Sequence, residues 1–342
     1  MAGNLVLLTG ATGMIGFRTM ILLLEAGYQV RAAVLYPAEF EKTSNLKPVL
    51  PYKSQLESIV VPDITVEGAY DEAVKGVKYI VHIASPLGSS VPPNGDFETL
   101  LIQPAIRGTV GMLESASKAT GIRKVVITGS ILSLSTFAIL SRKELTTEQT
   151  RRGALQGPYE SQYAAYGASK ALALDAAEKY IAEKKPSYDV INIFPSYTIG
   201  RDETVTEAQD ITRGSNGMLM YALLGIDRQK PLFGGAVHLD DVARLHVLAL
   251  GPEIEGNHDF IANVEPLEDQ DWARSFDIVK RRFPEAYAEG VFKFESIPRP
   301  VTIQIHIDGT KAEKTFAGFK YKSYEEQVVS VVEHYLELLG KN

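Results

Sequence analysis

Apolar residues near the start of the chain change from a continuous run to a helical spacing and back again. Residues 5–9 are a short apolar run, which predicts a buried strand. Four apolar residues then recur at intervals of three or four, as on one face of a helix: Phe17, Met20, Ile21 and Leu24. A second apolar run occupies 27–35. This pattern predicts strand, helix and strand, the unit from which parallel sheets are built.

The same alternation continues to about residue 200 and then weakens. Further apolar runs predict strands at 56–61, 78–84, 124–130 and 188–194, and helical patterns lie at 103–120 and from 163 onward. A terminal amphipathic helix is expected at 321–339. We therefore predict an α/β fold: a Rossmann-type doubly wound parallel sheet in residues 1–200 and a smaller C-terminal substrate lobe in 201–342. Part of the later chain, about 233–262, is expected to return to the first domain.

Composition narrows the class of protein. The 342 residues are 45% hydrophobic with a formal net charge of −7, which suits a large α/β core and argues against general binding to nucleic acid or anionic membrane. No cysteine is present, and no basic residue precedes Arg18, so we expect a cytoplasmic protein without a signal peptide. His238 and His246 are too far apart for a compact metal pair, and no metal is expected. The expected assembly is a monomer or a homodimer.

Three glycines stand between the first predicted strand and helix, at Gly10, Gly13 and Gly16. One allows a tight turn, one allows backbone N–H groups to approach a pyrophosphate, and one allows the helix to pack close to the sheet. The phosphate then lies at the positive end of the helix. We predict a dinucleotide site here that also uses Thr12, Met14 and Ile15.

The end of the second strand bears on the choice of cofactor. Dinucleotide sites for NAD normally place an acidic residue there to accept the ribose hydroxyls, but Leu35 and Tyr36 occupy this position. The nearest cations that could meet a 2′-phosphate are Arg31 and Lys42, although each could equally be a surface residue. NADP(H) is therefore favoured over NAD(H).

Two further loops follow predicted strands and lie at the same edge of the sheet. Asp63 can accept a hydrogen bond from an adenine amino group while Ile64 packs on the ring, although Asp63 suits a turn nearly as well. Ala84, Ser85 and Pro86 form the loop after the fourth strand, where ligands of open α/β folds bind. His82 lies within an apolar run and is expected to be a packed residue.

Tyr166 stands four residues before Lys170 in a long helical run, so the two side chains share one face of the helix. A nearby cation favours the phenolate and lowers the phenol pKa, which makes Tyr166 a candidate proton donor to a carbonyl oxygen. Tyr163 lacks this arrangement, because Gly167 stands four residues after it. Ser130 ends the fifth predicted strand and would face the same crevice.

Together these motifs resemble the extended short-chain dehydrogenases/reductases. Within them the chain is similar to the dihydroflavonol 4-reductase-like group, in particular to fungal and yeast NADPH-dependent carbonyl reductases. The residues that carry the resemblance are Thr9-Gly10-x-x-Gly13-x-x-Gly16, His82-x-Ala84-x-Pro86, Ser130, Tyr166-x-x-x-Lys170 and Pro195.

The resemblance implies a catalytic set in which Ser130 orients the carbonyl, Tyr166 protonates it, and Lys170 lowers the tyrosine pKa and binds the nicotinamide ribose. Hydride comes from nicotinamide C4. Tyr166, Lys170, Pro195 and Thr198 would also contact the cofactor. We place an apolar substrate pocket beside Pro86, at Leu87, Ile131, Leu132, Tyr197 and Met218.

The chain departs from this group at two points. An arginine that clamps the 2′-phosphate commonly ends the second strand in the group, and Leu35 stands there instead. Thr128-Gly129-Ser130-Ile131-Leu132 replaces a more polar sequence around the serine, which predicts a more apolar pocket.

Two other functions stay open on the sequence. A nucleotide-sugar epimerase or dehydratase with bound NAD would need basic side chains that bind a diphosphate. Arg201, Arg213 and Arg244 could supply them. A non-catalytic dinucleotide sensor is disfavoured because Ser130 and both members of the Tyr/Lys pair are present.

Overall fold

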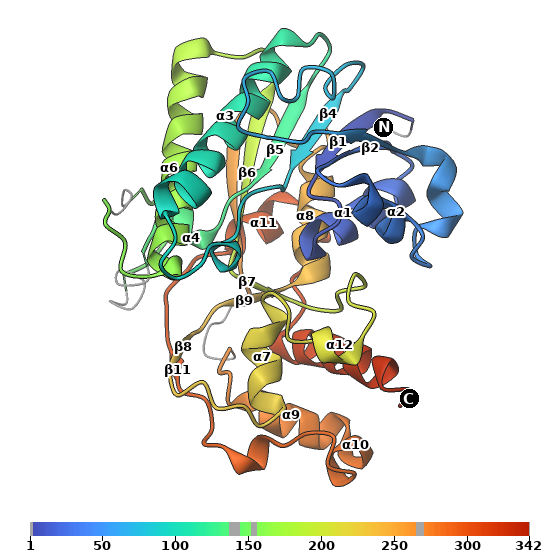
Figure 1. Ribbon diagram of the computed structural model, residues 1–342, viewed down its shortest axis with the longest axis vertical. Helices are drawn as coiled ribbons and strands as arrows, with labels where there is room; N and C mark the ends of the chain where they lie inside the picture. Colours follow the sequence, from blue (N-terminus) through green and yellow to red (C-terminus); the bar gives the residue numbers. More distant parts are fainter. Residues whose placement is uncertain (1–2, 137–143, 152–155, 265–269, 342) are drawn as a thin grey trace.

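The computed structural model describes residues 3–136, 144–151, 156–264 and 270–341. Seven parallel strands form the central sheet in the order β10-β6-β5-β4-β1-β2-β3 (Figure 1). The strands are β1 (Leu5–Thr9), β2 (Gln29–Val34), β3 (Leu56–Val60), β4 (Tyr79–His82), β5 (Lys124–Thr128), β6 (Asp189–Pro195) and β10 (His258–Ala262). The order reverses between β1 and β4, which is where dinucleotides bind in folds of this kind. The predicted Rossmann-type sheet is confirmed.

Helices cover both faces of this sheet (Figure 1). One face carries α1 (Met14–Glu25), α8 (Leu239–Leu248) and α11 (Thr310–Thr315). The other face carries α3 (Gln103–Lys118) and α6 (Gln162–Lys184), and α2 (Pro37–Ser44) follows β2. The doubly wound arrangement follows from right-handed crossovers between parallel strands.

Strand β2 shows how the sequence divides its side chains between the two faces. Val30, Ala32 and Val34 belong to the apolar core under α1 and α8. Ala33 belongs to the core under α3 and α6. Because successive side chains of a strand point to opposite faces, a sheet covered on both sides needs apolar residues at both.

A smaller lobe lies below the sheet in Figure 1. Its helices are α7 (Asn216–Leu223), α9 (Arg274–Arg282), α10 (Pro284–Ala288) and α12 (Tyr324–Leu338). Two parallel two-stranded ribbons accompany them: β7 (Tyr197–Ile199) with β9 (Ala236–His238), and β8 (Leu232–Phe233) with β11 (Thr302–Ile303). The lobe has its own apolar core, built mainly from α7, α9 and α12.

The remaining described helices are short. They are α4 (Ile131–Leu134), the 3₁₀ turns Leu50–Gln55, Gly88–Ser90, Ala208–Asp210 and Phe294–Ser296, and the π-helical turn Glu98–Ile102 that leads into α3. Within the described ranges, no helix is both long and apolar enough to span a bilayer. In the same ranges, acidic and histidine side chains form no cluster of three or more suited to a metal ion.

Buried and half-buried charges fix both ends of α8. The Lys124 ammonium donates to the carbonyl oxygens of Ala249, Gly251 and Ile254, just beyond the C-terminus of α8. At the other end of α8, Asp240 accepts from Arg18 of α1 at 2.6 Å and from Lys322 before α12 at 2.5 Å. These contacts hold α8 between the sheet and the smaller lobe.

Candidate active site

The glycine turn brings β1, α1 and the loop after β4 into close contact. Gly10 has a φ of +77°, and a Cβ there would lie 3.0 Å from the Ala84 nitrogen. A Cβ on Gly16 would lie only 1.9 Å from the Gly10 carbonyl oxygen. No residue other than glycine fits Gly16 without displacing the turn. The turn therefore needs glycine for the backbone geometry at Gly10 and for close helix packing at Gly16.

Gly13 is the N-cap of α1 and supplies no side chain to its first turn. The first turn also contains no acidic residue. The first backbone N–H groups of the helix, beside Thr12, Met14 and Ile15, thus meet neither a capping side chain nor a carboxylate. An uncapped helix start beside a glycine turn fits a phosphate group, and the dinucleotide site at these residues stays a prediction.

Thr9 joins the end of β1 to the loop after β4, and its role was missed in the sequence analysis. Its hydroxyl oxygen accepts from the N–H groups of Ile83 and Ala84 at 3.0 and 2.9 Å. The hydroxyl hydrogen is then available for His82 Nδ1, which lies 3.0 Å away. The signal was a hydroxyl residue at a parallel strand end, directly before the first glycine.

His82 is buried, as expected of a packed residue. Burial, and next the positive charge of Lys170, lower the pKa of His82 to about 3. The ring is therefore neutral at physiological pH, and the Thr9 bond at Nδ1 places its hydrogen on Nε2. His82 thus orients the Thr9 hydroxyl, and Thr9 in turn holds the loop that carries Ala84, Ser85 and Pro86.

Ser130, Tyr166 and Lys170 come together, although they arise from two separate elements. Ser130 is the N-cap of α4 directly after β5, and its Oγ accepts from the Leu132 N–H at 3.2 Å. The Ser130 side chain also interacts with the Tyr166 phenol and favours its ionised form. The Lys170 Nζ lies 5.7 Å from the centre of the Tyr166 ring. The helical spacing of four residues places the amine beside the phenol, as predicted.

The protonation of this pair is governed by burial. Burial raises the pKa of Tyr166 to about 12, and the hydrogen bond from Ser130 opposes that rise. Burial lowers the pKa of Lys170 to about 8. The net shift of the Tyr166 pKa is thus opposite to the lowering expected from the sequence, because the cost of removing a phenolate from water outweighs the interaction with Ser130.

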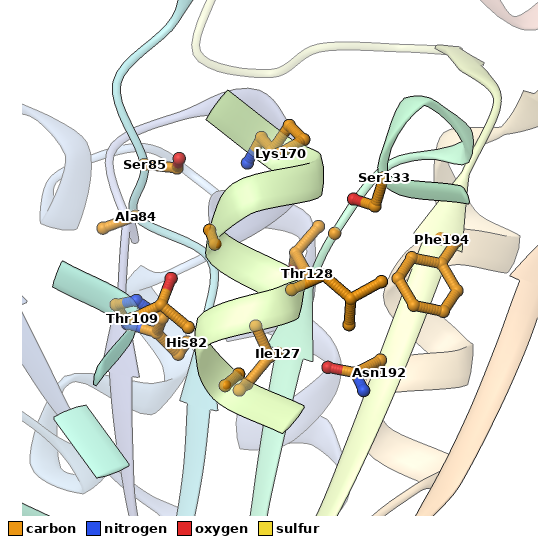
Figure 2. A pocket seen from close by; sticks show the side chains of 14 residues that line it. His82, Ala84, Ser85, Thr109, Ile127, Thr128, Ser133, Lys170, Asn192 and Phe194 are labelled. Atoms are coloured by element: carbon orange, nitrogen blue, oxygen red, sulfur yellow. The ribbon is translucent and has the colours of Figure 1, made fainter. Parts of the chain in front are cut away.

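A small cavity is lined by Lys170 of α6 and by residues from β4, β5 and β6 (Figure 2). Its volume is about 20 Å³, enough for about one water molecule. Lys170 lines it together with Ala84 and Ser85, and His82 and Asn192 lie deeper (Figure 2). Since Ala84 also touches Gly10, the cavity connects the Tyr/Lys helix to the glycine turn.

Arg31 does not occupy the position predicted for it. It stands in the middle of β2, opposite Glu57 of β3, three residues before the strand ends. Its Nε donates to Glu57 at 2.7 Å, and its Nη1 donates to the carbonyls of Ala73 and Lys75. The prediction that Arg31 meets a 2′-phosphate is wrong, because these bonds hold the guanidinium away from the strand tip. Lys42 is exposed in the last turn of α2.

Asp63 forms a local turn, the alternative kept open for it. Its carboxylate accepts from the backbone N–H and the hydroxyl of Thr65 at 2.8 and 2.7 Å, which lowers the pKa of Asp63. Asp63 is exposed, and Ile64 packs against Gly108 of α3. Asp63 thus carries a turn, and its contact with adenine stays a prediction.

The residues proposed for substrate and cofactor contact lie on several elements. Ile131 and Leu132 are buried in α4, in an apolar cluster that also contacts Tyr166. Leu87 is exposed in the loop after β4, Pro195 ends β6, and the buried Thr198 lies in β7. Tyr197 begins β7, and Met218 lies in α7. Phe233 packs on the same cluster as Tyr166 but carries no signal in the sequence beyond its hydrophobicity.

Comparison with known proteins agrees with this geometry. Residues 6–264 match the NAD dependent epimerase/dehydratase family. Ketoreductase CTB6 of Cercospora nicotianae is 39% identical over 353 residues, covering 100% of this chain and 98% of that protein. Dihydroflavonol 4-reductase of Solanum lycopersicum is 31% identical over 288 residues, which are 83% of this chain and 71% of that protein.

Solved reductase structures share the fold. Gre2 of Candida albicans in complex with NADPH is 25% identical, with a TM-score of 0.78 over 98% of this chain and 99% of that one. Yeast methylglyoxal/isovaleraldehyde reductase Gre2 is 23% identical, with a TM-score of 0.80 over 99% and 100%. With its Rossmann sheet, glycine turn and Tyr/Lys helix, the chain belongs to the NAD-dependent epimerase/dehydratase family of extended short-chain dehydrogenases/reductases.

Proposed function

We propose that the protein reduces a ketone or aldehyde to the alcohol with NADPH, reversibly, and that Tyr166 donates the proton. One arrangement carries the proposal: a partly buried tyrosine whose phenol interacts with the Ser130 side chain, with the Lys170 amine 5.7 Å from the centre of its ring. The same lysine shares a cavity with the loop that touches the glycine turn. The proton donor therefore stands beside the predicted dinucleotide site.

The residues around the glycine turn fit a nicotinamide dinucleotide. The uncapped start of α1 would hold the pyrophosphate, and Gly10 and Gly16 leave the backbone accessible there. Lys170 would bind the nicotinamide ribose, and Pro195 and Thr198 would lie near the nicotinamide. When bound, the dinucleotide supplies hydride to the carbonyl carbon.

The chain's own groups position and protonate the substrate. The Ser130 hydroxyl orients the carbonyl oxygen, and Tyr166 transfers its phenolic proton to that oxygen. A pKa of about 12 keeps the phenol protonated at neutral pH, and a lysine with a pKa of about 8 is largely cationic there. The ammonium stabilises the phenolate left after transfer. In the reverse direction the same phenolate accepts the alcohol proton.

The relatives support reduction of a carbonyl. The full-length relative from Cercospora nicotianae is named a ketoreductase, and the Solanum lycopersicum relative is a dihydroflavonol 4-reductase. The Candida albicans Gre2 structure contains NADPH. We extend NADP(H) to this chain because Leu35 and Tyr36 follow β2, where a sheet that binds NAD normally carries a carboxylate.

The nucleotide-sugar alternative gains no support from its candidate cations. Arg201 is paired with Glu337 at 2.6 Å, and the Arg244 guanidinium stacks 5.3 Å from the centre of the Phe319 ring. Both side chains thus lie at the surface with a partner of their own, a carboxylate for Arg201 and an aromatic ring for Arg244. Reduction of a carbonyl group is thus the function that the site supports best.

The direct test is an absorbance assay at 340 nm, the wavelength at which reduced nicotinamide absorbs. The protein is mixed with NADPH or NADH and a panel of aromatic and aliphatic ketones and aldehydes. We expect loss of absorbance with at least one class of carbonyl, faster with NADPH, and alcohol as the product. No turnover across the panel with either cofactor would refute the proposal.

A further inference from the structure

The loop after β4 packs against the first turn of α6, at the residue proposed as the proton donor. The contact is made by Gly88, which begins the short turn Gly88–Ser90. A Cβ on Gly88 would lie 3.0 Å from the Gln162 carbonyl oxygen and 3.2 Å from the Tyr166 Cβ. Both separations are shorter than the about 3.5 Å at which carbon atoms normally pack. The loop backbone therefore leaves no room for a side chain between itself and Tyr166.

Space, and not backbone conformation, requires glycine at this position. Gly88 is not among the residues with a positive φ, so its backbone would accept a side chain. The turn is closed by its own bonds, since the N–H and the hydroxyl of Ser90 both donate to the Leu87 carbonyl oxygen, at 3.0 and 2.6 Å. The close approach to α6 is thus the feature that a larger residue would disturb.

A side-chain hydrogen bond holds the same loop against the helix. Gln162 is the first residue of α6, and its Nε2 donates to the Val91 carbonyl oxygen. Val91 is buried in a small apolar cluster with Leu101 and Ala165, and Tyr166 packs on that cluster. The loop is therefore fixed to the start of α6 by one polar bond and by apolar contacts.

The other end of the loop is fixed to the glycine turn. The Ala84 N–H donates to the Thr9 hydroxyl oxygen at 2.9 Å, and a Cβ on Gly10 would lie 3.0 Å from the Ala84 nitrogen. Four residues separate Ala84 from Gly88, which allow at most about 14 Å of extended chain. One short segment thus joins the predicted dinucleotide site to the helix that carries Tyr166.

We propose that Gly88 and Gln162 are positioning residues that set where the Tyr166 phenol stands relative to the dinucleotide crevice. This inference rests on the proposed function, since it assigns two further residues to the same site. A phenol displaced by a fraction of an ångström loses its alignment with the carbonyl oxygen in the transition state, whereas binding of the substrate changes little. Loss of either contact should therefore lower kcat more than it raises KM.

Gly88→Ala and Gly88→Val test the close approach in two steps. The added Cβ must displace its neighbours by a few tenths of an ångström, and the branched side chain must displace them further. We expect kcat to fall about tenfold in Gly88→Ala and about a hundredfold in Gly88→Val, with KM and the Kd for NADPH within about threefold. The matched control is Ser89→Ala at an exposed position of the same turn, which should keep wild-type values.

Gln162→Met tests the bond that holds the loop. Methionine has a similar length but donates no hydrogen bond, so the Val91 carbonyl loses its partner. We expect kcat to fall about fivefold, with KM little changed. Gln103→Met removes the same amide from the start of α3, where it bonds to the side chain of Glu98, and should leave kcat unchanged.

A double-mutant cycle separates positioning of the phenol from a general structural defect. In the Tyr166→Phe background there is no phenolic proton to misplace, so Gly88→Val should lower the residual kcat by less than about twofold. Equal losses with and without the phenol, or wild-type kcat in Gly88→Val, would overturn the inference while carbonyl reduction stands.

NMR spectroscopy keeps the two proposals separable if no carbonyl compound is reduced. The tyrosines carry an isotope label at Cζ, and the resonance of Tyr166 is the one missing from Tyr166→Phe. A shifted Tyr166 resonance in Gly88→Val, together with an unchanged one in Ser89→Ala, supports the positioning role. An unchanged Tyr166 resonance in Gly88→Val rejects it.

Discussion

Burial drives the two ionisable groups of the proposed donor pair toward their neutral forms. The pKa of Tyr166 rises to about 12, and that of Lys170 falls to about 8. The phenol therefore keeps its proton throughout the physiological range, whereas the amine loses its charge as the pH rises through about 8. A phenol that keeps its proton at neutral pH can donate it to a carbonyl oxygen, and a neighbouring ammonium stabilises the phenolate that remains.

Leu35 is the residue whose substitution tests where the adenosine phosphate lies. It is 48% exposed directly after β2, and Tyr36 beside it is exposed as well. Leu35→Arg should lower the Kd for NADPH about tenfold relative to NADH, because a guanidinium binds phosphate through charged hydrogen bonds. Fluorescence titration with both cofactors measures this ratio. An unchanged ratio would reject the placement of the 2′-phosphate at the tip of β2.

For single residues, spacing along a helix predicted side-chain positions better than charge did. Tyr166 and Lys170 could be paired from sequence, since four residues on a helix fix their common face. Arg31 could not be placed, because its partners Glu57, Ala73 and Lys75 come from other parts of the chain. The rise of the Tyr166 pKa was missed for the same reason: burial depends on the packing of the complete fold.

Helix α1 approaches the glycine turn so closely that a single added Cβ atom on the helix would clash with the turn. A Cβ at Gly16 would lie 1.9 Å from the Gly10 oxygen, well inside van der Waals contact. This approach also sets the position of the uncapped helix start at Gly13. The helix start that would present N–H groups to a phosphate is thus positioned by the absence of a side chain at Gly16.

Gly16→Ala should displace α1 from the turn. We expect a loss of about 2–4 kcal/mol in the free energy of unfolding and loss of NADPH binding. Urea unfolding and fluorescence titration measure the two effects. The control is Gly111→Ala within α3, where the added Cβ would come no closer than 4.0 Å to another residue and should stabilise the helix by about 0.5–1 kcal/mol. Wild-type stability and affinity in Gly16→Ala would contradict this account of the turn.

Long elements were predictable and very short ones were not. The strands of the sheet follow apolar runs, and α12 follows its heptad-like stripe and a capping box between Ser323 and Glu326. Strands β8 and β11 contain two residues each, too few for any period. Their pairing depends on the fold around them, and so does the position of Phe233.

Three buried histidines should make the free energy of unfolding depend on pH. Burial lowers the pKa of His82 to about 3 and those of His238 and His246 to about 4. The unfolded chain binds protons at these sites below about pH 6.5, whereas the folded chain does not. Asp241 acts in the opposite sense between about pH 4 and 6, since burial raises its pKa to about 6. Glu148 and Glu203, whose pKa burial also raises, act as Asp241 does. The histidines begin to act at a higher pH, because their pKa in the unfolded chain is about 6.5.

The free energy of unfolding should therefore fall as the pH is lowered from about 6.5 toward 4. Each histidine contributes at most about 1.4 kcal/mol per pH unit in this range. Urea unfolding at pH 7, 6 and 5 and constant ionic strength measures the slope. His246→Gln should flatten it, and the partly exposed His258→Gln should leave it unchanged. An equal or higher stability at pH 5 would show that the buried histidines do not govern acid unfolding.

The central claim is that Tyr166 is the proton donor of a carbonyl reductase, and its most direct test is the Tyr166→Phe variant. We expect kcat to fall about a thousandfold, the usual size of a general-acid contribution, while the Kd for NADPH stays within about threefold. Tyr180→Phe in the same helix, which loses the hydrogen bonds to Ser117 and to the Leu113 carbonyl oxygen, should keep wild-type turnover. Wild-type turnover by Tyr166→Phe would contradict the account.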